Sequence, residues 1–264
     1  MDTKIGFIGS GKMAEAIIGG MVKAGYQPDQ IFASNRGWDK LIRLKEIYHI
    51  QTLESNQEVA ELCDIVFLSV TPDKYPLVIE EIRDVIQDDS IVILIGGGEG
   101  LAENEERFGR KVKLVKAMPN TPVLVGEGIT SISFNSFINE NEKQRVVSLF
   151  NRIGKAEVIE ERLMDTASAV GGSSPAFMYM YIEALADAAV LYGMEREQAY
   201  NVAAQAALGA AKMVLETGEH PAKLKDDVCS PDGTTIQSVA ALETNGFRDA
   251  IIQAVRANME KMGY

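Results

Sequence analysis

Short hydrophobic runs alternate with segments of helical hydrophobic spacing through the first half of the chain. Residues 4–8 have the pattern of a buried strand, and the apolar helix pattern of residues 16–24 ends at Gly25. Helical patterns separate most of the strand patterns. The further strand patterns lie at residues 31–34, 65–70, 91–95, 112–117, 129–133 and 156–159. This alternation predicts an α/β fold, a Rossmann-like doubly wound sheet with mostly parallel strands.

The pattern changes after Glu161, where strand patterns are absent and helical spacing continues to the end. The helical segments are residues 175–192, 196–216, 234–242 and 247–261. We therefore predict two domains, a dinucleotide-binding domain at 1–160 and an all-helical domain at 161–264. Small residues are frequent at 199–211, which is typical of helices that pack closely in a core or a subunit interface. A monomer would expose much apolar surface, so we expect a homodimer joined through the helical domain, with a higher oligomer left open.

The composition of the 264 residues, 46% hydrophobic and 24% charged, is that of a folded protein with a sizeable core. No apolar run approaches the roughly 20 residues of a membrane span. The N-terminus enters a strand at once, which leaves no room for a signal peptide, so we expect a cytoplasmic protein. The net charge of −12, without a basic patch, argues against nucleic acid as a partner.

The few cysteines and histidines do not suggest a metal centre. Cys63 and Cys229 have neither metal nor redox spacing, and we expect free thiols, with Cys63 in the core. His49 and His220 lie far apart in the sequence without metal-like neighbours. Zinc chemistry and a histidine-centred triad are therefore not predicted.

A glycine motif lies between the first strand pattern and the first helix pattern. Residues 9–14 read Gly-Ser-Gly-Lys-Met-Ala, the G-x-G-x-x-A arrangement. Gly9 permits the tight turn, Gly11 lets the backbone approach a pyrophosphate, and Ala14 keeps helix and strand close. With a strand before it and a helix after it, this motif predicts a dinucleotide site rather than a chance glycine turn.

The end of the second strand indicates which dinucleotide binds. An Asp or Glu usually holds the ribose hydroxyls of NAD here, but this chain has Ser34, Asn35 and Arg36. Asn35 and Arg36 can hydrogen-bond a 2′-phosphate, so we predict NADPH, with NADH as a possible second cofactor. An exposed arginine in a loop is the alternative. Three further segments follow strands and should form the rim of the pocket: 70–72, 96–98 and 118–122.

Residues 230–235, Ser-Pro-Asp-Gly-Thr-Thr, predict a turn that leads into a helix. The first turn of a helix has backbone N–H groups without partners, so a small carboxylate can bind there. Thr234 and Thr235 add hydroxyl groups, and Thr235 is the candidate proton donor to a reacting atom. Ordinary turn and N-cap chemistry explains the same residues, and this alternative stays open.

Five separated segments resemble the pyrroline-5-carboxylate reductase family. They are residues 6–13, 67–72, 118–122, 172–177 with 183–187, and 230–235 with 242–243 and 246–248. The resemblance extends from Ile5 to about Ala257. It implies reduction of the cyclic imine of L-1-pyrroline-5-carboxylate to L-proline by hydride from NAD(P)H, the last step of proline biosynthesis. It also implies an interlocked dimer in which each active site draws on two chains.

The motifs and the resemblance together give the predicted site. Thr235 is the predicted catalytic residue. The predicted substrate-binding residues are Glu161, Ser230, Gly233, Thr234 and Thr235. The predicted cofactor-binding residues are Gly9, Ser10, Gly11, Lys12, Met13, Asn35, Arg36, Asn56, Ser69, Val70, Thr71, Pro72, Gly97 and Asn120.

The chain departs from the family pattern at four places. Thr71 replaces a lysine, Gly171 replaces a serine, and three glycines at 96–98 replace an Ala-Ala-Gly loop. Asp232 replaces a glycine and brings a negative charge near the predicted carboxylate site.

Two other functions remain alternatives. The departures are compatible with a catalytically weak paralogue that has a regulatory role. A β-hydroxyacid dehydrogenase would need a lysine early in the first long helix of the second domain, and residues 175–192 contain none.

Overall fold

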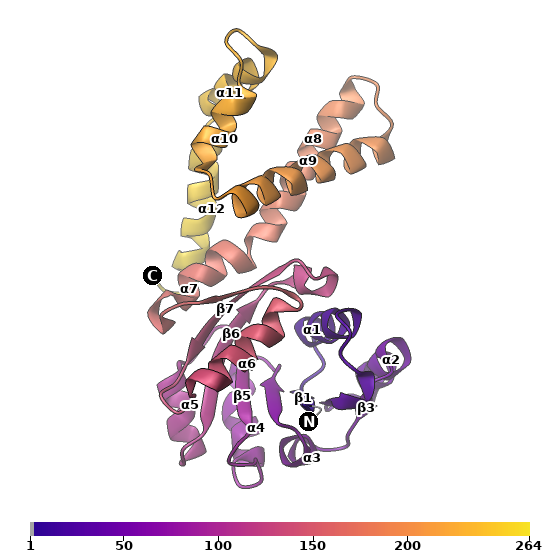
Figure 1. Ribbon diagram of the computed structural model, residues 1–264, viewed down its shortest axis with the longest axis vertical. Helices are drawn as coiled ribbons and strands as arrows, with labels where there is room; N and C mark the ends of the chain where they lie inside the picture. Colours follow the sequence, from indigo (N-terminus) through magenta and orange to yellow (C-terminus); the bar gives the residue numbers. More distant parts are fainter. Residues whose placement is uncertain (1–2) are drawn as a thin grey trace. The chain divides into compact units, whose positions relative to one another are not determined.

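Eight strands form one sheet in the part of the chain that ends at Ser173, within the residues 3–264 that the computed structural model describes. The strand order is β3-β2-β1-β4-β5-β6-β7-β8 (Figure 1). Neighbouring strands are parallel except β6 and β7, which are antiparallel. The strands are β1 (Ile5–Ile8), β2 (Ile31–Ser34), β3 (Gln51–Thr52), β4 (Ile65–Leu68), β5 (Ile91–Ile95), β6 (Lys113–Pro119), β7 (Gly128–Phe134) and β8 (Gly154–Val158).

The antiparallel pairing of β6 and β7 differs from the parallel arrangement that the strand patterns predict. Only a short 3₁₀ helix, η3 (Thr121–Val125), connects β6 to β7. A parallel connection needs a crossover of a dozen or more residues, so the chain has to turn back. The doubly wound fold itself is confirmed.

Helices cover both faces of the sheet. One buried cluster joins side chains of the sheet to α1 (Lys12–Lys23), α2 (Trp38–Tyr48) and α6 (Glu140–Asn151). A second cluster joins the opposite face to α3 (Asn56–Leu62), α4 (Tyr75–Ile82) and α5 (Leu101–Phe108). Helices α3 and α6 begin with capping boxes, which fix where each helix starts. Two short 3₁₀ helices, η1 (Pro28–Gln30) and η2 (Pro72–Lys74), lie in the connections.

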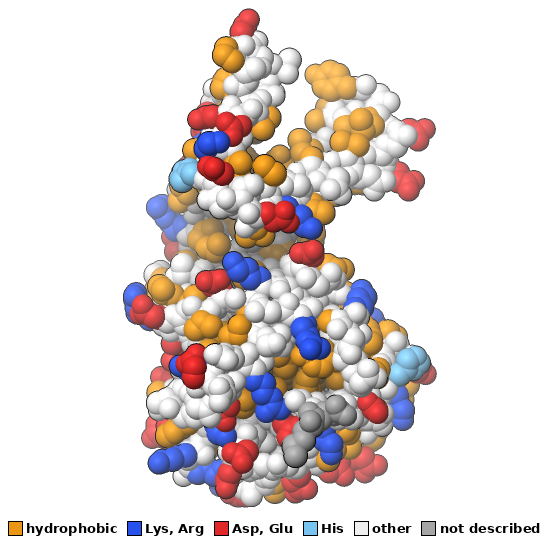
Figure 2. Space-filling model, viewed as in Figure 1, with side chains coloured by type: hydrophobic (Ala, Val, Ile, Leu, Met, Phe, Trp, Pro, Cys, Tyr) orange, Lys and Arg blue, Asp and Glu red, His pale blue; other side chains and the backbone are white. Residues whose placement is uncertain are grey.

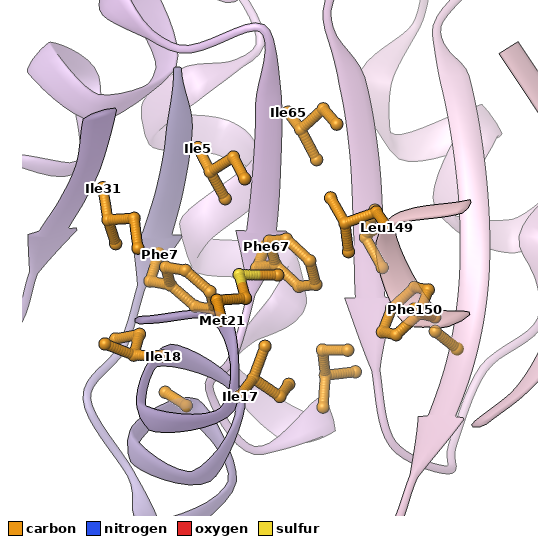
Figure 3. Close-up of a cluster of buried hydrophobic side chains, with 14 of the residues drawn as sticks. Ile5, Phe7, Ile17, Ile18, Met21, Ile31, Ile65, Phe67, Leu149 and Phe150 are labelled. Carbon is orange, nitrogen blue, oxygen red and sulfur yellow. The ribbon is translucent and has the colours of Figure 1, made fainter. Parts of the chain in front are cut away.

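Aromatic rings link the central strands to α6. Phe7 of β1 and Phe67 of β4 stack with ring centroids 4.6 Å apart, and Phe150 meets Phe67 edge-on at 6.0 Å (Figure 3). Every residue of β1, β4 and β5 is buried, because helices cover the sheet on both sides. This double burial explains why these strands are continuous hydrophobic runs in the sequence.

The second unit, residues 174–264, is entirely helical, as predicted. It contains α8 (Ser174–Leu191), α9 (Arg196–Thr217), α10 (Pro221–Val228), α11 (Thr234–Thr244) and α12 (Phe247–Lys261). Helix α8 packs against α9, and α11 packs against α12. Hydrophobic side chains remain on the surface of this unit (Figure 2). Met180, Val202 and Leu215, for example, are 68%, 59% and 70% exposed.

The segment between the last strand and α8 is a chain of short turns. It consists of η4 (Glu161–Leu163), α7 (Met164–Ala167) and the π-helical turn η5 (Ser168–Gly172). These turns pack on β6 and β7, so the compact units divide between Ser173 and Ser174. The functional boundary at 160/161 remains a prediction. Among residues 3–264, no helix is both long and hydrophobic enough to cross a membrane.

Burial of Cys63 predicts a loss of stability at alkaline pH. Desolvation raises the pKa of the Cys63 thiol to about 12, and the nearby Asp64 carboxylate adds to this effect. The folded-state pKa lies above the ordinary value of 9.0, so the stability contributed by the neutral thiol is fully present below pH 9. It is lost as the pH rises toward 12. We expect the melting temperature, measured by circular dichroism, to fall between pH 8 and pH 11 by less in Cys63→Ala than in the wild type. Equal falls in both proteins would contradict this assignment.

Candidate active site

A pocket of about 410 Å³ lies at the edge of the sheet where β1, β4, β5 and β6 end. The ends of these four strands and the residues that follow them supply most of the pocket wall. The turn η5 supplies the rest. The lining residues are Gly11, Lys12, Met13, Ser69, Val70, Thr71, Pro72, Ile95, Gly96, Gly97, Met118, Pro119, Ser168 and Gly172. Ligands of open α/β sheets bind at the carboxyl ends of the strands, so the pocket has the expected position.

The glycine motif forms the turn between β1 and α1. Gly9 has φ +99°, and a Cβ atom there would lie 2.8 Å from the Ser69 carbonyl oxygen, so only glycine fits. Gly11 is the N-cap of α1, and no side chain caps this helix. The first N–H groups of α1 are therefore available to a phosphate.

Polar side chains at the end of β2 form a small network. The Ser34 hydroxyl donates to Asn56 Oδ1 at 2.8 Å. Asn35 Oδ1 accepts from the Ser10 N–H at 3.2 Å, and its Nδ2 donates to the Gly37 carbonyl at 2.9 Å. Arg36 is exposed and forms no ion pair within the described part of the chain. Its guanidinium is thus free to bind an anion.

Two buried hydroxyl groups, one in the pocket wall at Ser69 and one in the adjoining glycine turn at Ser10, indicate that this region fits a polar ligand. Ser10 Oγ and Ser69 Oγ are buried and have no hydrogen-bond partner among residues 3–264. Buried hydroxyl groups are normally hydrogen-bonded, so each needs a partner from a ligand or water. Gly96 and Gly97 face open space on the side where a Cβ would project. These features leave room and hydrogen-bonding groups for a polar ligand.

Two predicted site residues have their polar atoms engaged with the backbone of this unit. Asn120 Nδ2 donates to the Gly171 carbonyl at 2.9 Å, and Asn120 Oδ1 accepts from the Ile129 N–H at 3.0 Å. Glu161 Oε1 accepts from the Leu101 N–H at 2.6 Å. Asn120 therefore supports η5, and Glu161 holds the start of α5.

The predicted carboxylate cradle in the second unit is an uncapped helix start. Gly233 is the N-cap of α11 and supplies no capping side chain, and its N–H donates to the Ser230 carbonyl at 3.0 Å. Thr234 and Thr235 form the first turn. No hydrogen bond of the Thr235 hydroxyl occurs within the described residues. Helix α11 thus offers both N–H groups and a free hydroxyl.

Asp232 adopts a left-handed backbone conformation with φ +58° immediately before this helix start. Glycine is favoured in this region, but Asp tolerates it better than most residues. The side chain is exposed to solvent, so water screens its charge from a bound carboxylate.

Sequence patterns missed part of the pocket wall. Ser168 lines the pocket from η5, and the sequence gives no motif there. Gly172 also lines the pocket, and its signal in the sequence is that it begins the segment 172–177 that carries part of the family resemblance.

Two segments of the chain match known families. Residues 4–98 match the family described as NADP oxidoreductase, coenzyme F420-dependent, and residues 161–263 match pyrroline-5-carboxylate reductase dimerisation. The pyrroline-5-carboxylate reductase of Escherichia coli K12 is 47% identical over 262 residues, which cover 99% of this chain and 97% of that protein. The chain belongs to the pyrroline-5-carboxylate reductase family.

Solved pyrroline-5-carboxylate reductases have the same fold over the whole chain. The enzyme from Coxiella burnetii aligns with a TM-score of 0.89 and 33% identity over 99% of this chain and 97% of that one. The Plasmodium falciparum pyrroline carboxylate reductase, solved with NADP bound, aligns with a TM-score of 0.87 and 34% identity over 98% and 97%. The family resemblance is thereby confirmed, and it leaves the β-hydroxyacid dehydrogenase alternative without support.

Proposed function

We propose that this member of the pyrroline-5-carboxylate reductase family reduces L-1-pyrroline-5-carboxylate to L-proline, using NADPH. The observation that carries the proposal is the pocket at the strand ends, with its glycine turns and the unpartnered Ser69 hydroxyl group in its wall. Gly9, Gly11 and the start of α1 would hold the pyrophosphate. The turns after β4 and β5 would hold the nicotinamide, which supplies the hydride when bound.

The substrate carboxylate would bind at the start of α11. The free N–H groups there, together with the positive end of the helix dipole, favour an anion without a lysine or arginine. The Thr235 hydroxyl would then donate a hydrogen bond to the ring nitrogen. An imine nitrogen is basic enough to be partly protonated already, so the weak acidity of threonine is sufficient. Positioning therefore supplies most of the catalytic effect.

A direct assay tests this function. Purified protein, NADPH and pyrroline-5-carboxylate are mixed, and both the oxidation of NADPH and the formation of proline are measured. We expect one molecule of proline to form for each molecule of NADPH that is oxidised. Tight NADPH binding without turnover would instead favour the weak paralogue with a regulatory role.

We further propose that NADPH is preferred over NADH because of Arg36. Its exposed guanidinium and the Asn35 amide lie at the end of β2, where the adenosine ribose of a dinucleotide binds. Arg36→Ala is expected to raise the KM for NADPH about tenfold, since a charged hydrogen bond contributes about 1.5–3 kcal/mol and solvent reduces that value here. The KM for NADH should stay within about twofold.

Arg43→Ala is the matched control for this experiment. Arg43 lies on α2 and pairs with Glu15 at 2.9 Å on the exposed surface. Its loss should leave both KM values unchanged. A parallel rise of both KM values in Arg36→Ala would exclude a specific contact with the 2′-phosphate.

We also propose a homodimer joined through the helical unit, in which each active site draws on both chains. The exposed hydrophobic side chains of α8 and α9, and the match of residues 161–263 to a dimerisation domain, support this proposal. A cytoplasmic location and the absence of a nucleic acid partner remain predictions from the sequence.

A further inference from the structure

Four side chains, three of them buried, hold the backbone of the segment that leads from β5 into α5. The Tyr75 hydroxyl donates to the carbonyl of Ile95, the last residue of β5, at 2.8 Å, and Lys116 Nζ donates to the Gly98 carbonyl in the turn at 3.4 Å. Asn104 Nδ2 donates to the Gly100 carbonyl at 2.7 Å, and Glu161 accepts from Leu101, as described above. The end of β5 and the turn contribute Ile95, Gly96 and Gly97 to the pocket. The backbone of this segment is therefore fixed at several points around the residues that face the ligand.

Lys116 is the most unusual of these four side chains. It lies in the middle of β6, between Leu94 of β5 and Ser133 of β7, and is only 5% exposed. It forms no ion pair within residues 3–264, and the Gly98 carbonyl is its one hydrogen-bond acceptor there. A buried ammonium without a carboxylate is unfavourable for folding, and an apolar side chain would fit a central strand better. A role outside stability would account for a lysine at this position.

The position of Gly98 connects Lys116 to the pocket. Gly98 has φ +103°, and a Cβ atom there would lie 2.7 Å from Cβ of Pro72. The turn after β5 is therefore packed directly on the turn after β4, and both turns line the pocket. Holding the Gly98 carbonyl fixes the direction in which the adjacent Gly97 peptide faces the ligand.

We propose that Lys116 is a positioning residue for the nicotinamide half of the cofactor. It acts through the Gly98 carbonyl: the buried ammonium fixes the turn formed by Gly96, Gly97 and Gly98 against the turn that carries Pro72. The proposal rests on the dinucleotide use proposed above. It does not require Lys116 to contact the cofactor, because misplacement of binding groups by about 1 Å is enough to reduce a rate strongly.

The test compares Lys116→Met with Lys113→Met and Lys116→Arg. Lys113 lies on the same strand, pairs with Asp89 at 2.9 Å and Glu142 at 2.7 Å, and is not part of the turn. NADPH affinity is measured by titration of cofactor fluorescence without substrate, and amide hydrogen exchange is measured across residues 95–101. Steady-state kinetics follow. The binding measurement is independent of imine reduction, so a failure of the proposed substrate would be seen separately.

In Lys116→Met we expect NADPH binding to weaken about tenfold, exchange at Gly97 and Gly98 to accelerate, and kcat to fall by a similar factor. Lys116→Arg should restore most of the affinity, because it keeps a charged donor. Lys113→Met should bind NADPH as the wild type does, even if it melts at a lower temperature. Wild-type NADPH affinity and exchange in Lys116→Met would overturn the proposal. If Lys116→Met does not fold, the same measurements on Lys116→Gln test the proposal. A neutral amide should give an NADPH affinity between that of the wild type and the tenfold weaker value, and wild-type affinity would overturn the proposal.

Discussion

Thr235→Ala is expected to lower kcat for pyrroline-5-carboxylate about 10²-fold while the dissociation constant of NADPH changes by less than about twofold. The side chain lies in the first turn of α11, is half-buried, and has a hydroxyl without a partner among the described residues. A hydrogen bond to a nitrogen whose charge changes during the reaction is strongest in the transition state, so its loss reduces kcat more than binding. Steady-state kinetics and a fluorescence titration of NADPH measure the two quantities.

Two further variants make the Thr235 experiment specific. Thr235→Ser keeps the hydroxyl and should retain most of the turnover. Thr234→Ala changes the adjacent residue and should raise the KM for the substrate more than it lowers kcat. The catalytic role of Thr235 would be excluded if Thr235→Ala lost NADPH affinity and turnover equally, or if it kept full turnover.

Much of the fold can be predicted because the sheet is buried on both faces. Strands β2 and β5 match their predicted hydrophobic runs residue for residue. The pattern of hydrophobic runs does not predict three features of the fold, each for a physical reason. The two-residue β3 is too short for any periodicity, the reversed direction of β7 depends on the length of the connection, and the eight-residue α10 is short and mostly exposed. Local hydrophobicity does not encode strand direction.

The residues of the site also fall into two groups, those that a local sequence motif reveals and those whose role depends on the arrangement of the sheet. Glycine turns that act through their own backbone, at Gly11 and Gly97, are visible as motifs and do line the pocket. Lys116 of β6 acts on the backbone of the turn after β5, and its role depends on which strands become neighbours. A lysine inside a hydrophobic strand pattern is therefore informative only after the sheet order is known.

Gly20→Ala is expected to lower the free energy of unfolding by about 2 kcal/mol and to weaken NADPH binding. Gly20 lies inside α1, and an added Cβ would overlap the backbone carbonyl oxygen of Val123 in η3. A backbone atom cannot move aside as a side chain does, so α1 must shift away from η3. Overpacking of this kind costs about 1–3 kcal/mol, and the better helix propensity of alanine offsets about 1 kcal/mol. We place the net value at about 2 kcal/mol because the overlap is with backbone. Helix α1 begins at the pocket, at Lys12, so its displacement would also disturb the proposed phosphate site.

Gly19→Ala is the matched control, because it adds the same methyl group one position earlier on the same helix. There the new Cβ would meet only the ends of two side chains, Leu124 Cδ1 at 2.7 Å and the Tyr48 hydroxyl at 2.9 Å. The end of Leu124 can rotate away and the half-buried Tyr48 side chain can swing outward about χ1, so the gain in helix propensity should roughly cancel the cost. Melting temperatures then separate the two variants: Gly20→Ala should melt roughly 4–8 °C below the wild type, and Gly19→Ala close to it. Equal melting temperatures for the two variants would show that the backbone of η3 moves as readily as a side chain. The close contact between α1 and η3 would then not determine the stability of the protein.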